Sequence, residues 1–197
     1  SRVLTGGRVP AEGRDWFVRF GRVVLGTIVF DFRARVSSDE EREFLAARVV
    51  NSSATYRDID RADSVLLVGF EPEEESPIVF LRINKQVRKR ALKVTAIASN
   101  LSNGNVKFNS NFISVVPGAE AAAIATQELT EKSVILVGER ASESVGTLSA
   151  VAALADRTGA KVAWIPRRAG ERGALSAGAI GNLLPGGRPV LDPVARV

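Results

Sequence analysis

The sequence predicts an α/β fold in which a mainly parallel sheet is flanked by helices. Short apolar runs rich in β-branched residues follow the pattern of strands that are buried on both faces. Helical patterns alternate with these runs, and alternation of this length predicts parallel strands joined by right-handed crossovers. The expected strands are residues 64–69, 92–98, 112–116, 133–138 and 161–166, and the expected helices between them are 77–90, 117–128 and 144–158.

Length and composition indicate how the chain is organised. Its 197 residues, 45% of them hydrophobic, suit one domain with a sizeable core. We expect three segments within this domain of residues 1–197. They are a helical lead-in (1–60), an α/β core (61–166) and a connecting segment rich in glycine, arginine and proline (167–197).

Two helices are expected in the lead-in. One covers about residues 13–24, where large apolar side chains recur every three or four positions (Trp16, Phe17, Phe20 and Val24). The other covers about residues 39–50 and has Ser37 or Ser38 as its N-cap. Further along, the helix at 144–158 should end at Gly159, because glycine suits the left-handed C-cap.

The loop between the first strand and its helix, residues 69–77, carries the most informative functional signal. Ser76 suits the helix N-cap and Pro77 its first turn. In dinucleotide-binding folds such a loop brings a ligand phosphate to the positive end of the helix dipole. Here the loop holds carboxylates that complement the dipole themselves and repel a second anion: Glu71, Glu73, Glu74 and Glu75. We expect a solvated acidic turn that stabilises the helix start, and a working phosphate or pterin site is the alternative.

The segment VGFEPEEESPIVFLRINKQVRKRALKV, which begins at Val68, resembles the Gly-x-Asn-Pro-x-x-x-x-Pro segment of the molybdopterin oxidoreductase superfamily. Glu71 stands where cofactor-binding members usually have Asn or Asp. The chain is most similar to one branch, the large iron-sulfur subunit (the G-subunit) of bacterial NADH-quinone oxidoreductase, or respiratory complex I, in its actinobacterial form. Further similarity lies in LTGGR at 4–8, RFGRVVLGT at 19–27, DFRAR at 31–35, EFLAARV at 43–49 and AWIPRRAGERGALSAGAIGNLLPGGRP at 163–189.

The resemblance implies a Rossmann-like three-layer domain that belongs to a longer iron-sulfur subunit and has lost the molybdenum cofactor. Such a structural domain would support NADH-to-quinone electron transfer, coupled to proton translocation, with no redox centre of its own. The implied partners are the N-terminal cluster-bearing region of the same subunit and other peripheral-arm subunits, on the inner face of the cell membrane. The loop would then be a vestigial dinucleotide loop, formed by Gly69, Glu71, Pro72 and Pro77. The alternative is a fragment of a molybdopterin-dependent oxidoreductase such as formate dehydrogenase, whose loop still contacts a guanine dinucleotide.

The sequence lacks residue types that catalysis and metal binding commonly use. The sequence has no cysteine and no histidine, so it lacks disulfides, cysteine-ligated clusters and the usual ligands of zinc and haem. With no such base or nucleophile and no serine elbow, we expect no catalytic and no metal-ligating residue. The sequence has no methionine, even at position 1, so it is either a processed form or a piece of a longer polypeptide, and the family resemblance favours a piece. The lack of a membrane-length apolar run or signal peptide favours a cytoplasmic location.

Two further segments follow strands of the expected sheet. Gly138, Glu139 and Arg140 lie at the carboxyl edge, where α/β folds bind ligands, but a surface loop is the preferred interpretation. Segment 166–189 combines glycines with arginines that suit either packing against another domain or enclosing a nucleotide: Arg167, Arg168 and Arg172. The sequence leaves both roles open.

The net charge of +5 and a pI of about 10.1 raise a nucleic-acid hypothesis. Aromatic residues make up only 6% of the chain and none interleaves with the basic cluster, as single-strand binders require. A solvated helix face, or a docking surface for an acidic neighbouring subunit, explains the cluster better, so we expect no nucleic-acid partner. The cluster comprises Arg82, Lys85, Arg88, Lys89, Arg90 and Lys93.

Overall fold

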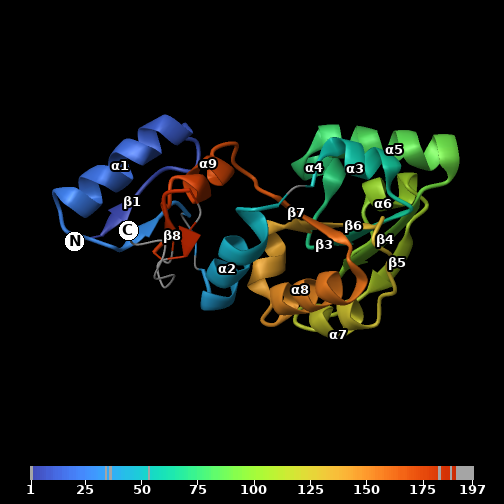
Figure 1. Ribbon diagram of the computed structural model, residues 1–197. Coiled ribbons are helices and arrows are strands. Elements are labelled where there is room, and N and C mark those ends of the chain that lie inside the picture. Colours follow the sequence, from blue (N-terminus) through green and yellow to red (C-terminus); the bar gives the residue numbers. More distant parts are fainter. Residues whose placement is uncertain are drawn as a thin grey trace. The chain divides into compact units, whose positions relative to one another are not determined.

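The computed structural model describes residues 2–33, 35, 37–52, 54–181, 183–186 and 188–189 (Figure 1). Its contacts divide the chain into two compact units. One, here called the terminal unit, joins Ser1–Asn51 to Arg168–Val197, and the other, the sheet unit, is Ser52–Arg167. The expected segment boundaries at 60/61 and 166/167 lie near this division. That the whole chain forms one domain stays a prediction.

The sheet unit contains five parallel strands, which confirms the predicted parallel sheet. The strand order is β5-β4-β3-β6-β7. From β3 the chain moves outward to β5 and then returns to β6 on the other side of β3, so the switch point of the sheet lies between β3 and β6. The strands are β3 (Ser64–Val68), β4 (Lys93–Ala98), β5 (Asn111–Ser114), β6 (Val134–Gly138) and β7 (Lys161–Ile165).

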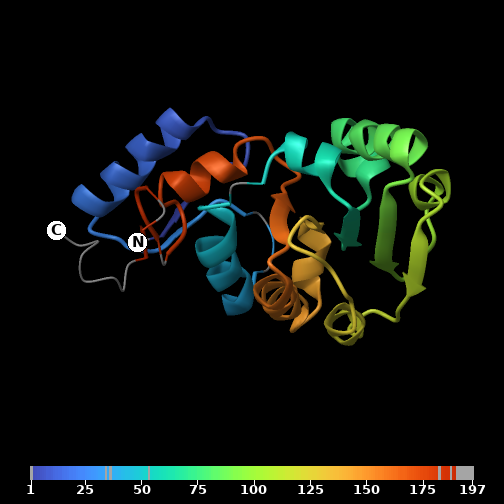
Figure 2. The same cartoon turned by 45° about the vertical axis from the view of Figure 1, so that its right-hand side comes forward.

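Helices cover both faces of this sheet. Figures 1 and 2 show α3 (Tyr56–Arg61) and α5 (Pro77–Arg90) on one face, and α7 (Glu120–Ala125) and α8 (Thr147–Thr158) on the other. Because both faces are covered, the central strands β3 and β6 are buried along their lengths, with Val65 aligned to Val134 and Leu67 to Leu136. This burial explains why these strands are continuous apolar runs in the sequence.

Helix α5 has the predicted bounds, and α8 ends at Gly159 in the left-handed conformation, as predicted. Ser76 occupies the N-cap position of α5, but its side chain makes no capping hydrogen bond. A short helix, α4 (Pro72–Glu75), fills the loop before it. Helices α7 and α8 begin later than expected, because Gly118 and Gly146 adopt positive φ angles before them. A 3-10 turn, η2 (Glu139–Glu143), precedes α8.

Short helices were not predicted, because a few residues cannot display a helical period. Side-chain hydrogen bonds at their N-termini stabilise these helices instead. In α3, Thr55 and Asp58 form a reciprocal capping box. In α6 (Asn103–Lys107), the Ser102 side chain accepts a hydrogen bond from the backbone N–H of Asn105.

The terminal unit is assembled from the two ends of the chain. It holds α1 (Ala11–Val23), α2 (Asp39–Phe44) and α9 (Glu171–Ser176), with α2 continuing as the π-helical turn η1 (Leu45–Val49). Ser38, and not Ser37, caps α2. Strand β1 (Val3–Leu4) pairs in parallel with β2 (Phe30–Asp31), and β8 (Leu183–Leu184) pairs antiparallel with β9 (Arg188–Pro189). The expected connecting segment therefore contains a helix and two strands, while its residues 190–197 lie outside the described part.

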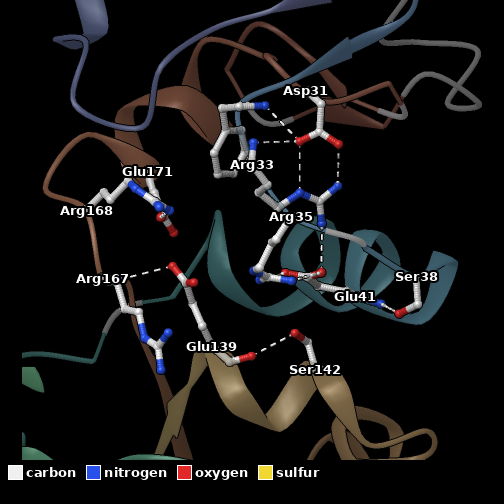
Figure 3. Close-up of polar contacts among 11 residues, drawn as sticks. Asp31, Arg33, Arg35, Ser38, Glu41, Glu139, Ser142, Arg167, Arg168 and Glu171 are labelled. Atoms are coloured by element: carbon white, nitrogen blue, oxygen red, sulfur yellow. Dashed lines mark hydrogen bonds and ion pairs between the residues drawn. The ribbon is translucent and has the colours of Figure 1, made fainter.

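Charged side chains are buried inside the terminal unit. Glu41 is fully buried and forms ion pairs with Arg33, at 3.0 Å between Nη1 and Oε2, and with Arg35 (Figure 3). Arg33 also contacts Asp31, with Nε 2.9 Å from Oδ1. Burial alone would raise the pKa of Asp31, but hydrogen bonds and the charge of Arg33 outweigh it and hold that pKa below its ordinary value. These pairs tie β2 to α2.

The predicted helix near residue 13 is present as α1, but its aromatic side chains do not face the core. Its buried residues are Arg14, Val18 and Gly21. The Arg14 guanidinium donates hydrogen bonds to the carbonyls of Gly6 and Gly170.

No helix in the described part of the chain is long and apolar enough to cross a membrane.

Candidate functional site

The turns that follow β3 and β6 meet at the switch point, where α/β folds bind ligands. Gly69 has φ +54°, and a Cβ added there would lie 2.5 Å from the backbone nitrogen of Ala141. A Cβ on Gly138 would overlap the carbonyl oxygen of Gly69. The absence of a side chain at both glycines therefore allows the backbones of the two turns to come into direct contact.

The acidic loop reaches across this junction through Glu75. A carboxylate oxygen of Glu75 lies 2.6 Å from Nη2 of Arg140, which follows β6, and 3.9 Å from Nη2 of Arg167, which follows β7. The Glu75 side chain is only 11% exposed. Burial raises the pKa of Glu75 above its ordinary value, although both arginines oppose that shift. One carboxylate thus joins the loops after three strands.

Helix α6 covers the remainder of the acidic loop. Lys107 forms an ion pair with Glu73. A Cβ on Gly104 would lie 2.5 Å from Oε1 of Glu71, so the α6 backbone packs directly on that carboxylate. The expected solvated turn is thus found only at Glu74, which is exposed, whereas the other three carboxylates are half-buried against neighbouring elements.

The segment Gly138 to Arg140, which follows β6, contacts the loop after β7. Glu139 is buried, and its Oε1 accepts a hydrogen bond from the backbone N–H of Arg167 at 3.2 Å (Figure 3). The Ser142 hydroxyl donates to the Glu139 carbonyl at 2.7 Å. Of the arginines in segment 166–189, Arg167 therefore belongs to the junction in the sheet unit. Arg168 lies in the terminal unit, near Glu171 of α9 at 3.8 Å.

A cavity of about 700 Å³ lies at this edge of the sheet, lined by the segments that follow β3, β4 and β6. Three carboxylates and one guanidinium line it: Glu71, Glu120, Glu143 and Arg140. Burial would raise the pKa of Glu120, but hydrogen bonds from Ser144 and from backbone N–H groups hold it below its ordinary value. Glu120 is therefore ionised at neutral pH, and the excess of carboxylates disfavours an anionic ligand.

The basic cluster on α5 is partly paired within the chain. Arg82 contacts Asp60 at 2.6 Å and lies over the Tyr56 ring. Arg90 donates to the side chain of Gln86 and to the carbonyl of Asp60. The other cations of the cluster are exposed, namely Lys85, Arg88, Lys89 and Lys93. In the described part of the chain, no three acidic, histidine or cysteine side chains gather in a way that could hold a metal ion.

The sequence profile of the molybdopterin oxidoreductase family matches residues 21–179. The chain belongs to this family. It is 52% identical over 204 residues to proteins named as the G-subunit of NADH-quinone oxidoreductase from Mycobacterium bovis and Mycobacterium tuberculosis. It is 42% identical over 226 residues to the protein of the same name from Streptomyces coelicolor. The predicted resemblance is confirmed.

These alignments cover 98% of the chain but only 25–27% of the relatives. The chain thus spans about a quarter of the length of the curated relatives it matches. The family name implies a molybdopterin cofactor, and the residues at the sheet edge do not fit its phosphate. Glu75 already pairs with the arginines that would neutralise an anion, and carboxylates outnumber guanidinium groups in the lining of the cavity.

Proposed function

We propose that this chain is a structural domain of the G-subunit of an NADH-quinone oxidoreductase. In this role it supports NADH-to-quinone electron transfer, coupled to proton translocation, and holds no redox centre of its own. The observation that carries the proposal is the ion pairing of Glu75 with Arg140 and Arg167 at the carboxyl edge of the sheet.

A carboxylate in this place performs the electrostatic role of a bound anion. It neutralises two guanidinium groups and links the loops after β3, β6 and β7. A phosphate at the same place would have to displace Glu75 and approach Glu71 at close range, which costs Coulomb energy in a partly buried site. The domain is therefore suited to hold a fixed shape without a cofactor, which is what a scaffold requires. Gly69, Glu71, Pro72 and Pro77 form its vestigial dinucleotide loop.

The names of the relatives support the proposed partners. We place the domain beside the cluster-bearing region of the same subunit and among other peripheral-arm subunits of complex I, on the inner face of the cell membrane. The iron-sulfur clusters belong to that other region, since this chain has neither cysteine nor histidine.

The test is purification of the native, full-length protein from solubilised membranes, with assay of the eluate for NADH oxidation, iron, molybdenum and pterin. NADH oxidation with iron, and without molybdenum or pterin, supports the scaffold. Molybdenum and pterin in stoichiometric amounts overturn it.

One observation favours a second candidate, a fragment of a molybdopterin-dependent oxidoreductase such as formate dehydrogenase. Within the described residues, three buried polar atoms that belong to residues lining the cavity have no hydrogen-bond partner, namely Oε1 of Glu71, Oδ1 of Asn105 and Oγ1 of Thr147. Buried polar groups are normally satisfied, so a bound ligand or ordered water at these atoms is expected. The same metal and pterin assay separates the two candidates.

A further inference from the structure

Helix α1 exposes its large apolar side chains, whereas a helix packed on a core normally buries them. The residues it buries are an arginine, a valine and a glycine, namely Arg14, Val18 and Gly21. On the opposite side Trp16 is 73% exposed and Phe20 is 52% exposed. An amphipathic surface helix normally buries its large apolar residues and exposes its charged ones. The arrangement in α1 is the reverse.

The exposed side chains form one surface, which we call the α1 outer face: Trp16, Phe17, Phe20, Val23 and Val24. Positions 16, 20, 23 and 24 follow helical spacing and lie on one side of the helix. The exposed apolar side chains continue past the helix end through Leu25, Ile28 and Val29. Single exposed apolar residues are ordinary, but a contiguous aromatic surface marks an interaction site.

Two arginines near this face make contacts within the terminal unit. Arg19 pairs with Asp15 at 2.7 Å, one helical turn away. Arg22 is directed to the carbonyls of Gly178 and Leu183 and lies over the Phe30 ring. The side chains that form the α1 outer face are all apolar, so its partner should be an uncharged, apolar protein surface.

The relatives supply a candidate partner surface. The region that matches this chain makes up 25–27% of each relative, so about three quarters of each polypeptide lies outside it. A surface on the same polypeptide is present at high effective concentration, which favours its contact over that of a separate molecule. Within the described part of the terminal unit, nothing covers the α1 outer face.

We propose that the α1 outer face is an intramolecular interface, which docks on an apolar surface of the same polypeptide outside these 197 residues. This inference rests on the proposed function, since it takes the chain as part of a longer subunit. It adds the surface through which the domain is held in that subunit.

The test is site-specific photo-crosslinking in the full-length subunit within the native complex. Benzoyl-phenylalanine replaces Trp16 or Phe20 in turn, and Leu101, an exposed apolar residue of the sheet unit, is the matched control position. Mass spectrometry then identifies the crosslinked peptides. Crosslinks from positions 16 and 20, but not from 101, to peptides of the same chain outside the 197 residues support the proposal. Crosslinks to residues 52–167, to a second copy, to another subunit or to lipid overturn it, as does the absence of crosslinks.

A substitution gives a second readout. Phe20→Asp should increase the rate of proteolysis within residues 1–51 of the full-length subunit at least several-fold, whereas Val145→Asp, at a residue 89% exposed, should leave it unchanged. Equal rates in both variants would contradict the proposal. The metal and pterin assay reports on the scaffold function independently, so a failed interface and a failed scaffold are distinguishable.

Discussion

Glu75 and Arg140 form an ion pair across the switch point of the sheet, with 2.6 Å between Oε1 and Nη2. The two residues come from the loops after the two central strands, which are distant in sequence and adjacent in the sheet. In this position a side chain of the protein meets the arginine that could otherwise bind an anion. Substitutions can probe this pair, the glycines beside it and the ion pairs that hold each unit.

Replacing Glu75 should release an anion site. In Glu75→Ala, both Arg140 and Arg167 lose their carboxylate, so pyrophosphate at low salt should raise the thermal midpoint of the variant and leave that of the parent unchanged.

The matched control for that experiment is Glu74→Ala. Glu74 is exposed on the same helical turn, so its removal changes the net charge equally and frees no arginine of the junction. An equal response of the two variants to pyrophosphate would show that net charge, and not the release of the arginines, governs binding.

The close contact of the two turns predicts that Gly138→Ala is destabilising. The new methyl group would overlap the carbonyl oxygen of Gly69, which is backbone and cannot rotate away. We expect a loss of about 1–3 kcal/mol. Urea denaturation followed by the fluorescence of Trp164, in a Trp16→Phe background, reports on the sheet unit. Gly6→Ala, where the nearest atom is a Val9 methyl at 3.7 Å, should change stability little.

Asp58 should make the stability of the sheet unit dependent on pH under acidic conditions. Hydrogen bonds from Lys161 and Thr55 lower the pKa of Asp58 to about 2, from 3.8. The folded state therefore favours the ionised form, and this stabilisation is complete above pH 3.8 and is lost as the pH falls toward 2. Asp58→Asn should show a shallower loss of stability over that interval, measured by urea midpoints at a series of pH values. An unchanged slope would contradict this account.

The buried carboxylate of Glu41 should contribute strongly to the stability of the terminal unit. Glu41→Ala leaves Arg33 buried without one of its ion pairs, and breaking a buried pair costs about 3–5 kcal/mol. Far-UV circular dichroism during urea denaturation should report this loss. The exposed carboxylate Glu43 on the same helix provides the control, since Glu43→Ala should cost under about 1 kcal/mol.

Much of the sheet unit could be predicted, because its signals are local. A buried strand such as β3 is a continuous apolar run, and α5 has a proline at its start and a helical period along its length. The short helices α3, α4, α6 and α9 escaped prediction, because caps and tertiary packing hold them. The two short strand pairs of the terminal unit escaped prediction for a related reason, since each strand is only two residues long.

The sequence by itself determined the α/β class, the parallel strands, the family and the acidic character of the loop after β3. All of these follow from the order of residue types along the chain. Tertiary structure alone decided that Glu75 pairs with Arg140 and Arg167, that Gly138 packs on Gly69, and that α1 presents its aromatic residues outward. These relations join residues distant in sequence, so they depend on which strands become neighbours and on which side of a helix finds a partner.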